Sequence, residues 1–267
     1  MKIIVITGST RGIGYGMTEC FLAQGWNVVI SGRKQENVDK KVKQLKVNYA
    51  HAQAFGLACD VKEFDQVKAL WHDSLKQFGK IDIWINNAGI AVPMMFFWDN
   101  DPDGIRQVVE TNMVGTMYGS KIAIEGMLTQ GFGSIFNMEG AGSTGRMHTQ
   151  MILYASTKRG LTYLNLGLIK ELEGTPIRLG ILRPGMVLTD FLLKDQDRNP
   201  EEWERTKKIF NILADKPENV CPVMVEGILN AKKHGEIIEY ISSIKMMMRF
   251  ITAPISKRNL FENEKSN

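Results

Sequence analysis

A chain of 267 residues, 44% of them hydrophobic and 23% charged, has the length and composition of one large globular α/β domain or two small ones. Its net charge of +4 is small and its first two thirds show no basic stripe, so we expect no nucleic-acid partner. Three widely spaced cysteines exclude a disulfide framework and a CxxC metal site: Cys20, Cys59 and Cys221. We therefore expect no metal. The sequence shows neither a secretory signal nor a bilayer-spanning apolar stretch, so we expect a cytoplasmic protein.

Strand-like and helix-like patterns alternate from the first residues. The first apolar run, 3–6, is followed by the helical spacing of Ile13, Met17 and Phe21, which ends near Gly25. Three further strands are each followed by a helix: 28–30 by a Lys-rich amphipathic helix around 38–45, 54–58 by 64–78, and 81–85 by 105–128. A strand at 134–138, a helix at 151–173 and a strand at 177–182 come last.

This alternation predicts the fold class. Strands alternating with helices form a parallel sheet with helices on both faces, and right-handed crossovers make it doubly wound, as in a Rossmann fold. The chain has no repeat or linker, so we predict a single domain over 1–242, followed by a basic and apolar tail over 243–267. The segment 188–220 is charged and helical without a clear strand, which predicts a helical flap near the mouth of the site.

The turn after the first strand has the pattern of a phosphate-binding loop. Ligands of open parallel sheets bind beyond the carboxyl ends of the strands, where glycines admit a pyrophosphate and a helix offers free N–H groups. The spacing TGxxxGxG lies between a good strand and a good helix, so we predict a dinucleotide site rather than a plain turn. Its residues are Gly8, Ser9, Thr10, Arg11, Gly12, Ile13 and Gly14.

The end of the second strand indicates which cofactor is preferred. NAD sites place an acidic residue there for the ribose hydroxyl, whereas this strand ends in Ser31, Gly32 and Arg33. Arg33 and Arg11 can clamp a 2′-phosphate with charge-assisted hydrogen bonds, so we predict NADP(H) rather than NAD(H). The alternative is that both arginines are solvated surface charges.

Two later strand ends carry further candidates for cofactor contacts. Asp60 follows the third strand, where its carboxylate can accept from the adenine amino group or cap the next helix. The turn Asn86-Asn87-Ala88-Gly89 ends the fourth strand, and its place at a carboxyl end favours the cofactor cleft over an ordinary turn.

Tyr154 and Lys158 are the candidate catalytic pair. Their spacing of four residues puts them on one face of the predicted helix. A phenol has an ordinary pKa near ~10, and a neighbouring ammonium lowers it by stabilising the phenolate. Such a pair can donate a proton to an alkoxide or accept one in the reverse reaction. Taken alone, a Tyr and a Lys at this spacing are more often surface residues.

Together these motifs resemble the short-chain dehydrogenase/reductase family. TGSTRGIG at 7–14, NNAG at 86–89, Asn112, YxxxK at 154–158 and Pro184-Gly185 occur in the family's order over about residues 1–190. The resemblance implies a seven-stranded sheet and a homodimer or homotetramer. It also implies Tyr154 as the acid/base, Lys158 on the nicotinamide ribose, and Asn112 in a water-linked proton path. Further cofactor contacts implied are Val61, Asn87, Ala88, Gly89, Pro184, Gly185, Val187 at the nicotinamide amide and Thr189 at the pyrophosphate.

One position departs from the family pattern. The family has a serine after the fifth strand that hydrogen-bonds the substrate oxygen. Counting from the strand puts Gly140 there, and counting back from the tyrosine puts Ala141 there. We hypothesise that Ser143 replaces the missing donor; Thr144 or a backbone N–H group is the alternative.

Three stretches are similar to a narrower branch, the chlorophyll b reductases. They are FNMEGAGS at 136–143, YASTKRGL at 154–161 and RPGMVLTDFLL at 183–193. That branch reduces a formyl group on a bulky, flat, hydrophobic ring. Apolar residues at 94–98 and at 186 and 191–193 favour a lipophilic substrate pocket, with core packing as the alternative.

We therefore predict an NADPH-dependent oxidoreductase that reduces an aldehyde or ketone of a lipophilic molecule, or runs the reverse reaction. A steroid-like secondary-alcohol dehydrogenase and a non-catalytic NADP(H)-binding regulator are the alternatives, the latter because the serine is missing. The basic and apolar run 244–251 favours weak contact with a membrane surface, a subunit contact or packing on the sheet.

Overall fold

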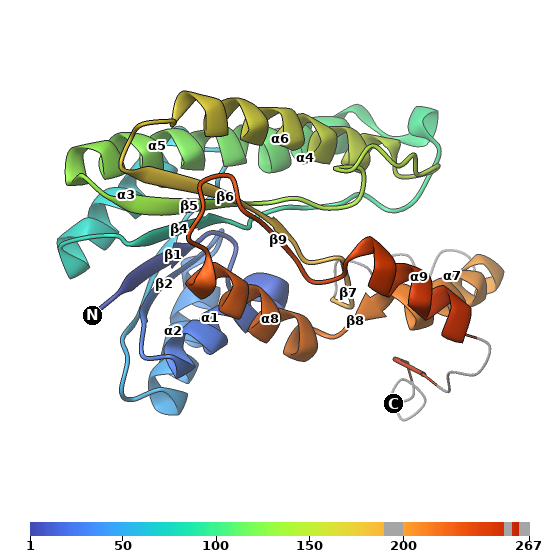
Figure 1. The fold of residues 1–267 in the computed structure, drawn as a ribbon, viewed down its shortest axis with the longest axis horizontal. Coiled ribbons are helices and arrows are strands. Elements are labelled where there is room, and N and C mark those ends of the chain that lie inside the picture. The colour runs from blue at the N-terminus through green and yellow to red at the C-terminus, as the bar shows by residue number, and fades with distance from the viewer. Residues whose placement is uncertain (190–199, 254–257, 262–267) are drawn as a thin grey trace.

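Seven strands form one parallel sheet in the order β3-β2-β1-β4-β5-β6-β9 (Figure 1). This computed structural model describes residues 1–189, 200–253 and 258–261. The strand bounds are β1 (Ile3–Ile6), β2 (Asn27–Gly32), β3 (Ala54–Ala58), β4 (Ile83–Asn86), β5 (Gly133–Met138), β6 (Ile177–Arg183) and β9 (Ile237–Glu239). Since the chain runs outward from β1 to β3 and then returns to β4 on the other side, the strand order reverses beside β1. The predicted doubly wound parallel sheet is confirmed.

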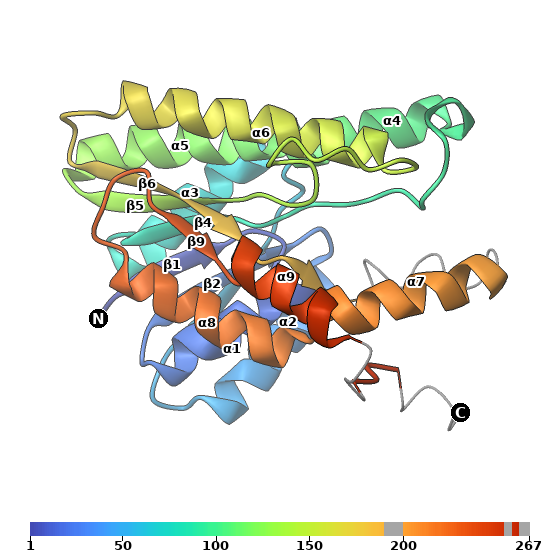
Figure 2. The same ribbon diagram turned by 45° about the vertical axis from the view of Figure 1, so that its right-hand side comes forward.

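Helices cover both faces of the sheet, as predicted (Figures 1 and 2). One face carries α1 (Gly12–Ala23), α2 (Gln35–Asn48) and α8 (Pro217–Asn230). The other carries α3 (Phe64–Phe78), α5 (Gly115–Gln130) and α6 (Ile152–Glu171). The helix expected over 105–128 is present in two parts, α4 (Pro102–Val109) and α5, joined by a π-helical turn over Glu110–Val114.

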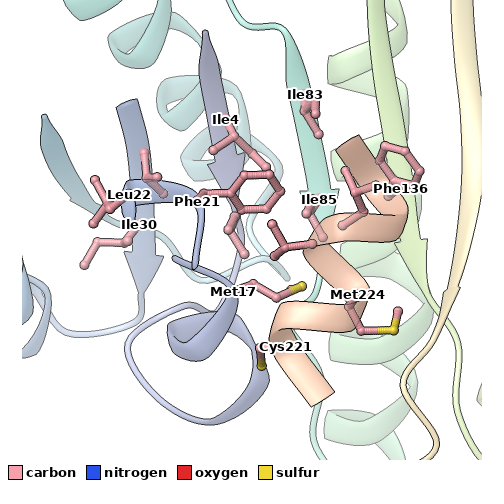
Figure 3. Close-up of a cluster of buried hydrophobic side chains, with 14 of the residues drawn as sticks. Ile4, Met17, Phe21, Leu22, Ile30, Ile83, Ile85, Phe136, Cys221 and Met224 are labelled. Carbon is pink, nitrogen blue, oxygen red and sulfur yellow. The ribbon is translucent and has the colours of Figure 1, made fainter. Parts of the chain in front are cut away.

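The strands are buried on both faces, which explains their uninterrupted apolar runs. Ile4 points into the cluster under α1 and α8, where it lies with Phe21 and Met224 (Figure 3). Ile6 belongs to the same cluster. Val5, between them in sequence, points to the opposite cluster with Trp84 and Trp71. Because side chains alternate along a strand, one short apolar run serves both cores.

The predicted flap contains a short strand that the sequence pattern did not indicate. Its helix is α7 (Pro200–Leu213), and β8 (Ala214–Asp215) follows directly and pairs in parallel with β7 (Met186–Val187). The expectation of a flap without a strand was therefore wrong, because a strand of two residues carries no periodicity. The ladder, α7 and α9 (Ser243–Thr252) lie beyond the carboxyl ends of the main strands (Figure 2).

The first part of the predicted tail packs back onto this flap. Arg249 of α9 donates to the buried Asp215 at 2.6 Å, and Arg258 donates to the other oxygen of the same carboxylate. Phe261 packs with Trp203 and Phe210. In the part of the chain that the structure describes, every helix is too short or too polar to cross a membrane.

Candidate active site

The turn after β1 is bound to the NNAG turn after β4 at the point where the strand order reverses. The Thr7 hydroxyl accepts the backbone N–H groups of Asn87 and Ala88 at 3.0 and 3.1 Å. The Asn87 amide donates to the carbonyls of Thr7 and Gly8 at 2.9 and 3.1 Å. Ligands of doubly wound sheets bind at this place.

Two glycines allow these turns to touch. Gly8 has a φ of +62°, and a Cβ there would lie 2.8 Å from Ala88 Cα. A Cβ on Gly14 would lie 2.5 Å from Asn87 Nδ2, so neither position accepts a side chain without displacement. The N-terminus of α1 has neither an acidic first-turn residue nor a side-chain cap, which leaves N–H groups for an anion. The residues present therefore fit a pyrophosphate.

The remaining residues of the first turn divide into internal and exposed ones. Ser9 is fully buried; its hydroxyl donates to Ile6 O at 2.6 Å and accepts Ser31 N–H at 3.0 Å, so it ties β1 to β2. Arg11 and Arg33 are exposed, as a contact with a ribose phosphate requires. Ile13 packs against the core under α1.

Other predicted cofactor residues lie around this turn. A Cβ on Gly12 would lie 3.6 Å from Thr189 Cγ2, which places Thr189 beside the turn. A Cβ on Gly32 would lie 2.8 Å from Thr10 Cγ2, so the turn also contacts the end of β2. Val187 is buried in β7, directly after the Pro184-Gly185 pair.

Asp60 does not cap the next helix. The N-cap of α3 is Glu63, whereas the Asp60 carboxylate accepts Lys62 N–H at 3.1 Å and lies 3.7 Å from Lys62 Nζ. The capping alternative was therefore wrong, and the adenine contact stays a prediction. Val61 is buried, and a Cβ on Gly115 would lie 2.6 Å from it.

Tyr154 and Lys158 lie on one face of α6, directed at the ends of β5 and β4. The Lys158 ammonium donates to Met138 O at 3.0 Å and lies 5.7 Å from the centre of the Tyr154 ring. A Cβ on Gly89 would lie 3.9 Å from Lys158 Nζ, so the catalytic helix meets the NNAG turn. The structure thus brings the YxxxK motif to the NNAG turn, which itself contacts the first turn.

Burial controls the protonation of this pair. It raises the pKa of the Tyr154 phenol above its ordinary value. Burial also lowers the pKa of Lys158 to about 8, against an opposing effect of the Glu139 carboxylate. Burial, which the spacing of the two residues did not indicate, therefore outweighs the lowering of the phenol's pKa that was expected from the ammonium. At neutral pH Tyr154 keeps its proton, which equips it as an acid.

Asn112 lies fully buried in the π-helical turn and holds the NNAG loop to α6. Its Oδ1 accepts Ile90 N–H at 2.8 Å, and its Nδ2 donates to Ile90 O at 2.9 Å and to Thr157 Oγ1 at 3.2 Å. Thr157 is the neighbour of Lys158, so Asn112 fixes the distance between the loop and the catalytic helix. The water-linked path stays a prediction.

Gly140, one of the two candidate positions for the missing serine, lies against the Tyr154 phenol. A Cβ there would lie 2.5 Å from Tyr154 Oη, so the phenol takes the space of a side chain. The buried Ser143 hydroxyl accepts Gly140 N–H at 3.1 Å and donates to Lys158 O at 3.5 Å. This geometry favours a role for Ser143 in shaping the loop, and its predicted role as a substrate donor stays untested.

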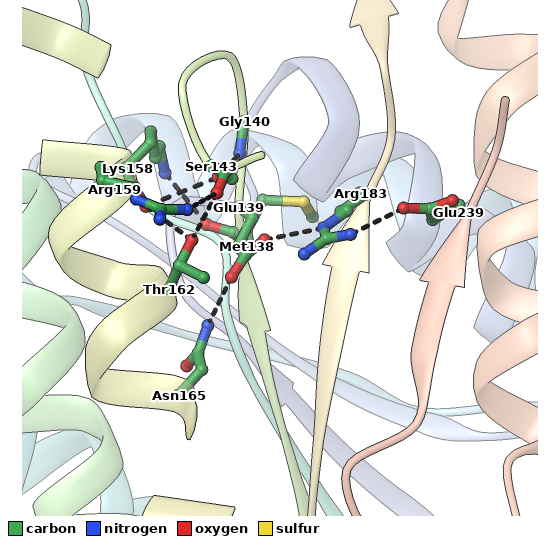
Figure 4. A network of polar contacts seen from close by, with 10 residues as sticks. All are labelled: Met138, Glu139, Gly140, Ser143, Lys158, Arg159, Thr162, Asn165, Arg183 and Glu239. Atoms are coloured by element: carbon green, nitrogen blue, oxygen red, sulfur yellow. Dashed lines mark hydrogen bonds and ion pairs between the residues drawn. The ribbon is translucent and has the colours of Figure 1, made fainter. Parts of the chain in front are cut away.

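Sequence reasoning missed a buried polar network next to the site (Figure 4). Glu139 accepts from Asn165 and Arg183, and Asn165 accepts from Asn137 at 2.7 Å. Asn137 in turn accepts from Asn86 at 2.8 Å. The signal available in the sequence was an acidic residue directly after a buried strand.

Apolar side chains lie exposed between β4 and α4. The rings of Phe96 and Trp98 stack at 4.9 Å with an angle of 3°, and Trp98 is 77% exposed. Met95 N–H donates to Gln150 O at 3.0 Å, which joins this stretch to the loop before α6. The predicted pocket residues Phe191, Leu192 and Leu193 lie outside the described residues.

Comparisons with known proteins agree with this geometry. A family model described as short chain dehydrogenase matches residues 2–202. The chain is 36% identical over 251 residues to the chloroplastic chlorophyll(ide) b reductase NOL of Arabidopsis thaliana, covering 91% of this chain and 70% of that protein. It is 33% identical over 280 residues to that plant's probable chlorophyll(ide) b reductase NYC1, covering 98% of this chain and 55% of that protein. The chain thus spans about half the length of NYC1.

Solved structures show the same fold. An actinorhodin polyketide ketoreductase crystallised with NADPH has a TM-score of 0.80 and 22% identity, covering 91% of this chain and 97% of that chain. At this level of identity the likeness concerns the fold alone.

Proposed function

The chain belongs to the short chain dehydrogenase family, and from this membership we propose that it is an NADPH-dependent reductase of a carbonyl group on a bulky, lipophilic molecule. The observation that carries the proposal is the meeting of Tyr154 and Lys158 with the NNAG turn, beside a glycine turn that admits a pyrophosphate. Resemblance to chlorophyll(ide) b reductases over most of the chain supports the substrate class.

The proposed chemistry needs one hydride and one proton. A nicotinamide cofactor whose pyrophosphate is held by the first turn would supply the hydride to the carbonyl carbon. Tyr154 would donate its proton to the carbonyl oxygen as negative charge develops there. The Lys158 ammonium would stabilise the resulting phenolate, because an opposite charge favours the ionised form.

The protonation of Tyr154 supports a role in reduction. A buried phenol with a raised pKa holds its proton at neutral pH and is ready to act as an acid. Oxidation of an alcohol would require the phenolate at the outset, which burial disfavours. We therefore propose that Tyr154 acts as the proton donor in the reductive direction near neutral pH.

The substrate we propose is a flat, hydrophobic ring system that carries a formyl group. The exposed stacked rings of Phe96 and Trp98 offer an apolar surface on the loop that follows the NNAG turn. Aromatic faces of this kind pair with other flat rings by offset stacking.

A substrate panel tests this function. Purified enzyme and NADPH are supplied with a formyl-bearing porphyrin-type ring, simple aromatic aldehydes and steroid ketones, and products are identified by mass spectrometry. We expect the formyl ring to be reduced to its alcohol, and Tyr154→Phe to lose at least about 10²-fold in kcat, the scale of a general acid. Tight NADPH binding without turnover anywhere would indicate a regulator, and preference for the steroids would indicate the dehydrogenase alternative.

For the cofactor we propose preference for NADP(H) over NAD(H). Arg33 follows β2 without a carboxylate at the strand's end, and Arg11 lies in the first turn. A charge-assisted hydrogen bond contributes about 1.5–3 kcal/mol, so Arg33→Ala should raise the Kd for NADPH by about 10- to 100-fold. The Kd for NADH should change little. Equal kcat/KM with the two cofactors in the wild type would contradict the preference.

We also propose a homodimer or homotetramer. The outer faces of α5 and α6 expose apolar side chains that a monomer would leave in water: Met117, Leu128, Tyr163 and Leu166. Leu166→Glu should shift the mass measured by light scattering to that of a monomer. An unchanged mass would place the interface elsewhere.

A further inference from the structure

Glu139 is a buried carboxylate at the end of β5. Its side chain is wholly enclosed. Arg183 Nε donates to one carboxylate oxygen at 2.8 Å, and Asn165 Nδ2 donates to the other at 3.1 Å (Figure 4). Buried carboxylates are costly unless they are paired and hydrogen-bonded. These contacts hold the Glu139 carboxyl group in one place inside the protein.

The backbone on both sides of Glu139 contacts the catalytic lysine. Met138 O, one residue before it, accepts from Lys158 Nζ at 3.0 Å. A Cβ on Gly140, one residue after it, would lie 3.5 Å from Lys158 Cε. The anion is therefore attached to the stretch of chain against which Lys158 packs.

The charge of Glu139 is not fully neutralised by Arg183, so it also acts on Lys158. Arg183 also donates to Glu239 in β9 at 2.8 Å, so its positive charge is shared between two carboxylates. The two negative charges of Glu139 and Glu239 are then balanced by the two positive charges of Arg183 and Lys158. Without the Lys158 ammonium the network would carry a net negative charge in a buried place.

The other groups packed around Lys158 supply no competing anion. Tyr154 on α6 is neutral, Asn112 and Thr157 carry no charge, and Arg159 donates to Ser143 O at 2.8 Å. The residues of the NNAG turn are uncharged. Within the described part of the chain, Glu139 is the anion whose field raises the pKa of Lys158, against the lowering by burial.

We propose that Glu139 is a positioning residue for the reaction, which keeps Lys158 charged by holding a buried carboxylate behind it. The proposal rests on the proposed function for its effect on turnover, but its effect on Lys158 itself is independent of any substrate. The Glu139 carboxylate is enclosed with Arg183 and Asn165, so in this proposal it acts through the lysine.

Glu139→Gln tests this role, because glutamine keeps the shape and removes the charge. The pKa of Lys158 is about 8, and Glu139 raises it against the effect of burial. Without this charge the pKa should be lower, so the decrease of kcat/KM for NADPH at alkaline pH should begin about one pH unit lower. At pH 8 this means a loss of about fivefold, with little change below pH 6. Glu139→Asp, which keeps the charge, should restore the pH at which this decrease begins.

Glu239→Gln is the matched control, since it removes one carboxylate from the same Arg183 but lies farther from the lysine and is partly exposed. In this variant the decrease of kcat/KM at alkaline pH should begin at the same pH as in the wild type. Arg183→Gln is an independent variant should Glu139→Gln not fold. It removes the cation that pairs with Glu139, and because an unpaired buried carboxylate takes up a proton, the decrease should move to lower pH, as in Glu139→Gln.

A second readout needs no turnover. Competitive acetylation of Lys158 by acetic anhydride, followed across pH by mass spectrometry, reports the pKa of the lysine in the free protein. We expect the same order of shifts as in the kinetic profile. If no carbonyl is reduced but the labelling shifts, the proposed function fails and the role of Glu139 stands. If Glu139→Gln leaves the labelling unchanged, or Glu239→Gln shifts it equally, the role of Glu139 is refuted.

Discussion

A methyl group added at residue 140 tests whether the Tyr154 hydroxyl must stay where the structure places it. In Gly140→Ala the new Cβ would lie 2.5 Å from Tyr154 Oη, whereas ordinary contacts of this kind begin near 3.4 Å. The φ of Gly140 is not in the left-handed region, so alanine can adopt the backbone and the effect is steric.

The size of the expected effect follows from that overlap. Relief of the contact requires the phenol or the loop to move by about 1 Å, and a misplacement of that size in an active site costs about 10²-fold in rate. We therefore expect kcat to fall about 100-fold, while the Kd for NADPH stays within about twofold because the first turn is untouched.

The assay is NADPH oxidation under steady-state conditions, with binding measured separately by fluorescence. Gly167→Ala is the matched control, because it lies on the same helix, α6, and a Cβ there meets nothing within 4 Å. That control should keep full activity and stabilise the helix by about 1 kcal/mol. Full turnover by Gly140→Ala would refute the placement of the phenol beside this loop.

Three further substitutions probe other parts of the structure. Gly14→Ala would force the first turn away from the NNAG turn and should weaken NADPH binding at least about tenfold by fluorescence titration; wild-type affinity would contradict the close approach. Ser143→Ala leaves the Gly140 N–H group unpaired at a cost of about 1–3 kcal/mol, so calorimetry should show a lower Tm. A fall in kcat at unchanged Tm would instead support Ser143 as a substrate donor. Asp215→Asn weakens both arginine contacts between flap and tail and should speed limited proteolysis there, whereas the exposed Asp103→Asn should not.

The strands and helices of the main sheet were predictable because parallel strands buried on both faces read as apolar runs. The exception is β9, which has three residues, two of them exposed, and so lacks that pattern. The pairing of Met186–Val187 with β8 was hidden for the same reason. Long, regular elements carry their own signal, whereas short ones depend on what they pack against.

The catalytic and cofactor motifs could be located by their order along the chain, but their electrostatics could not. The spacing of Tyr154 and Lys158 shows that an ammonium lies near a phenol. It does not show how deeply the two groups are buried, and burial proves to dominate both pKa values. Likewise, the contact between Gly140 and Tyr154 joins a loop to a helix that follows later in the chain, and only the fold brings them together.

The π-helical turn Glu110–Val114 joins α4 and α5 and rotates the side chains of α5 about the helix axis relative to those of α4. One extra residue turns everything beyond it by about 100° relative to a continuous α-helix. As a result α4 can pack against α6 while α5 packs against α3 and β5, and Asn112 points into the site from between them. Deletion of a single residue here would leave both helices intact yet rotate one against the other. The contacts of α4 with α6 and those of α5 with α3 and β5 could then not form at the same time.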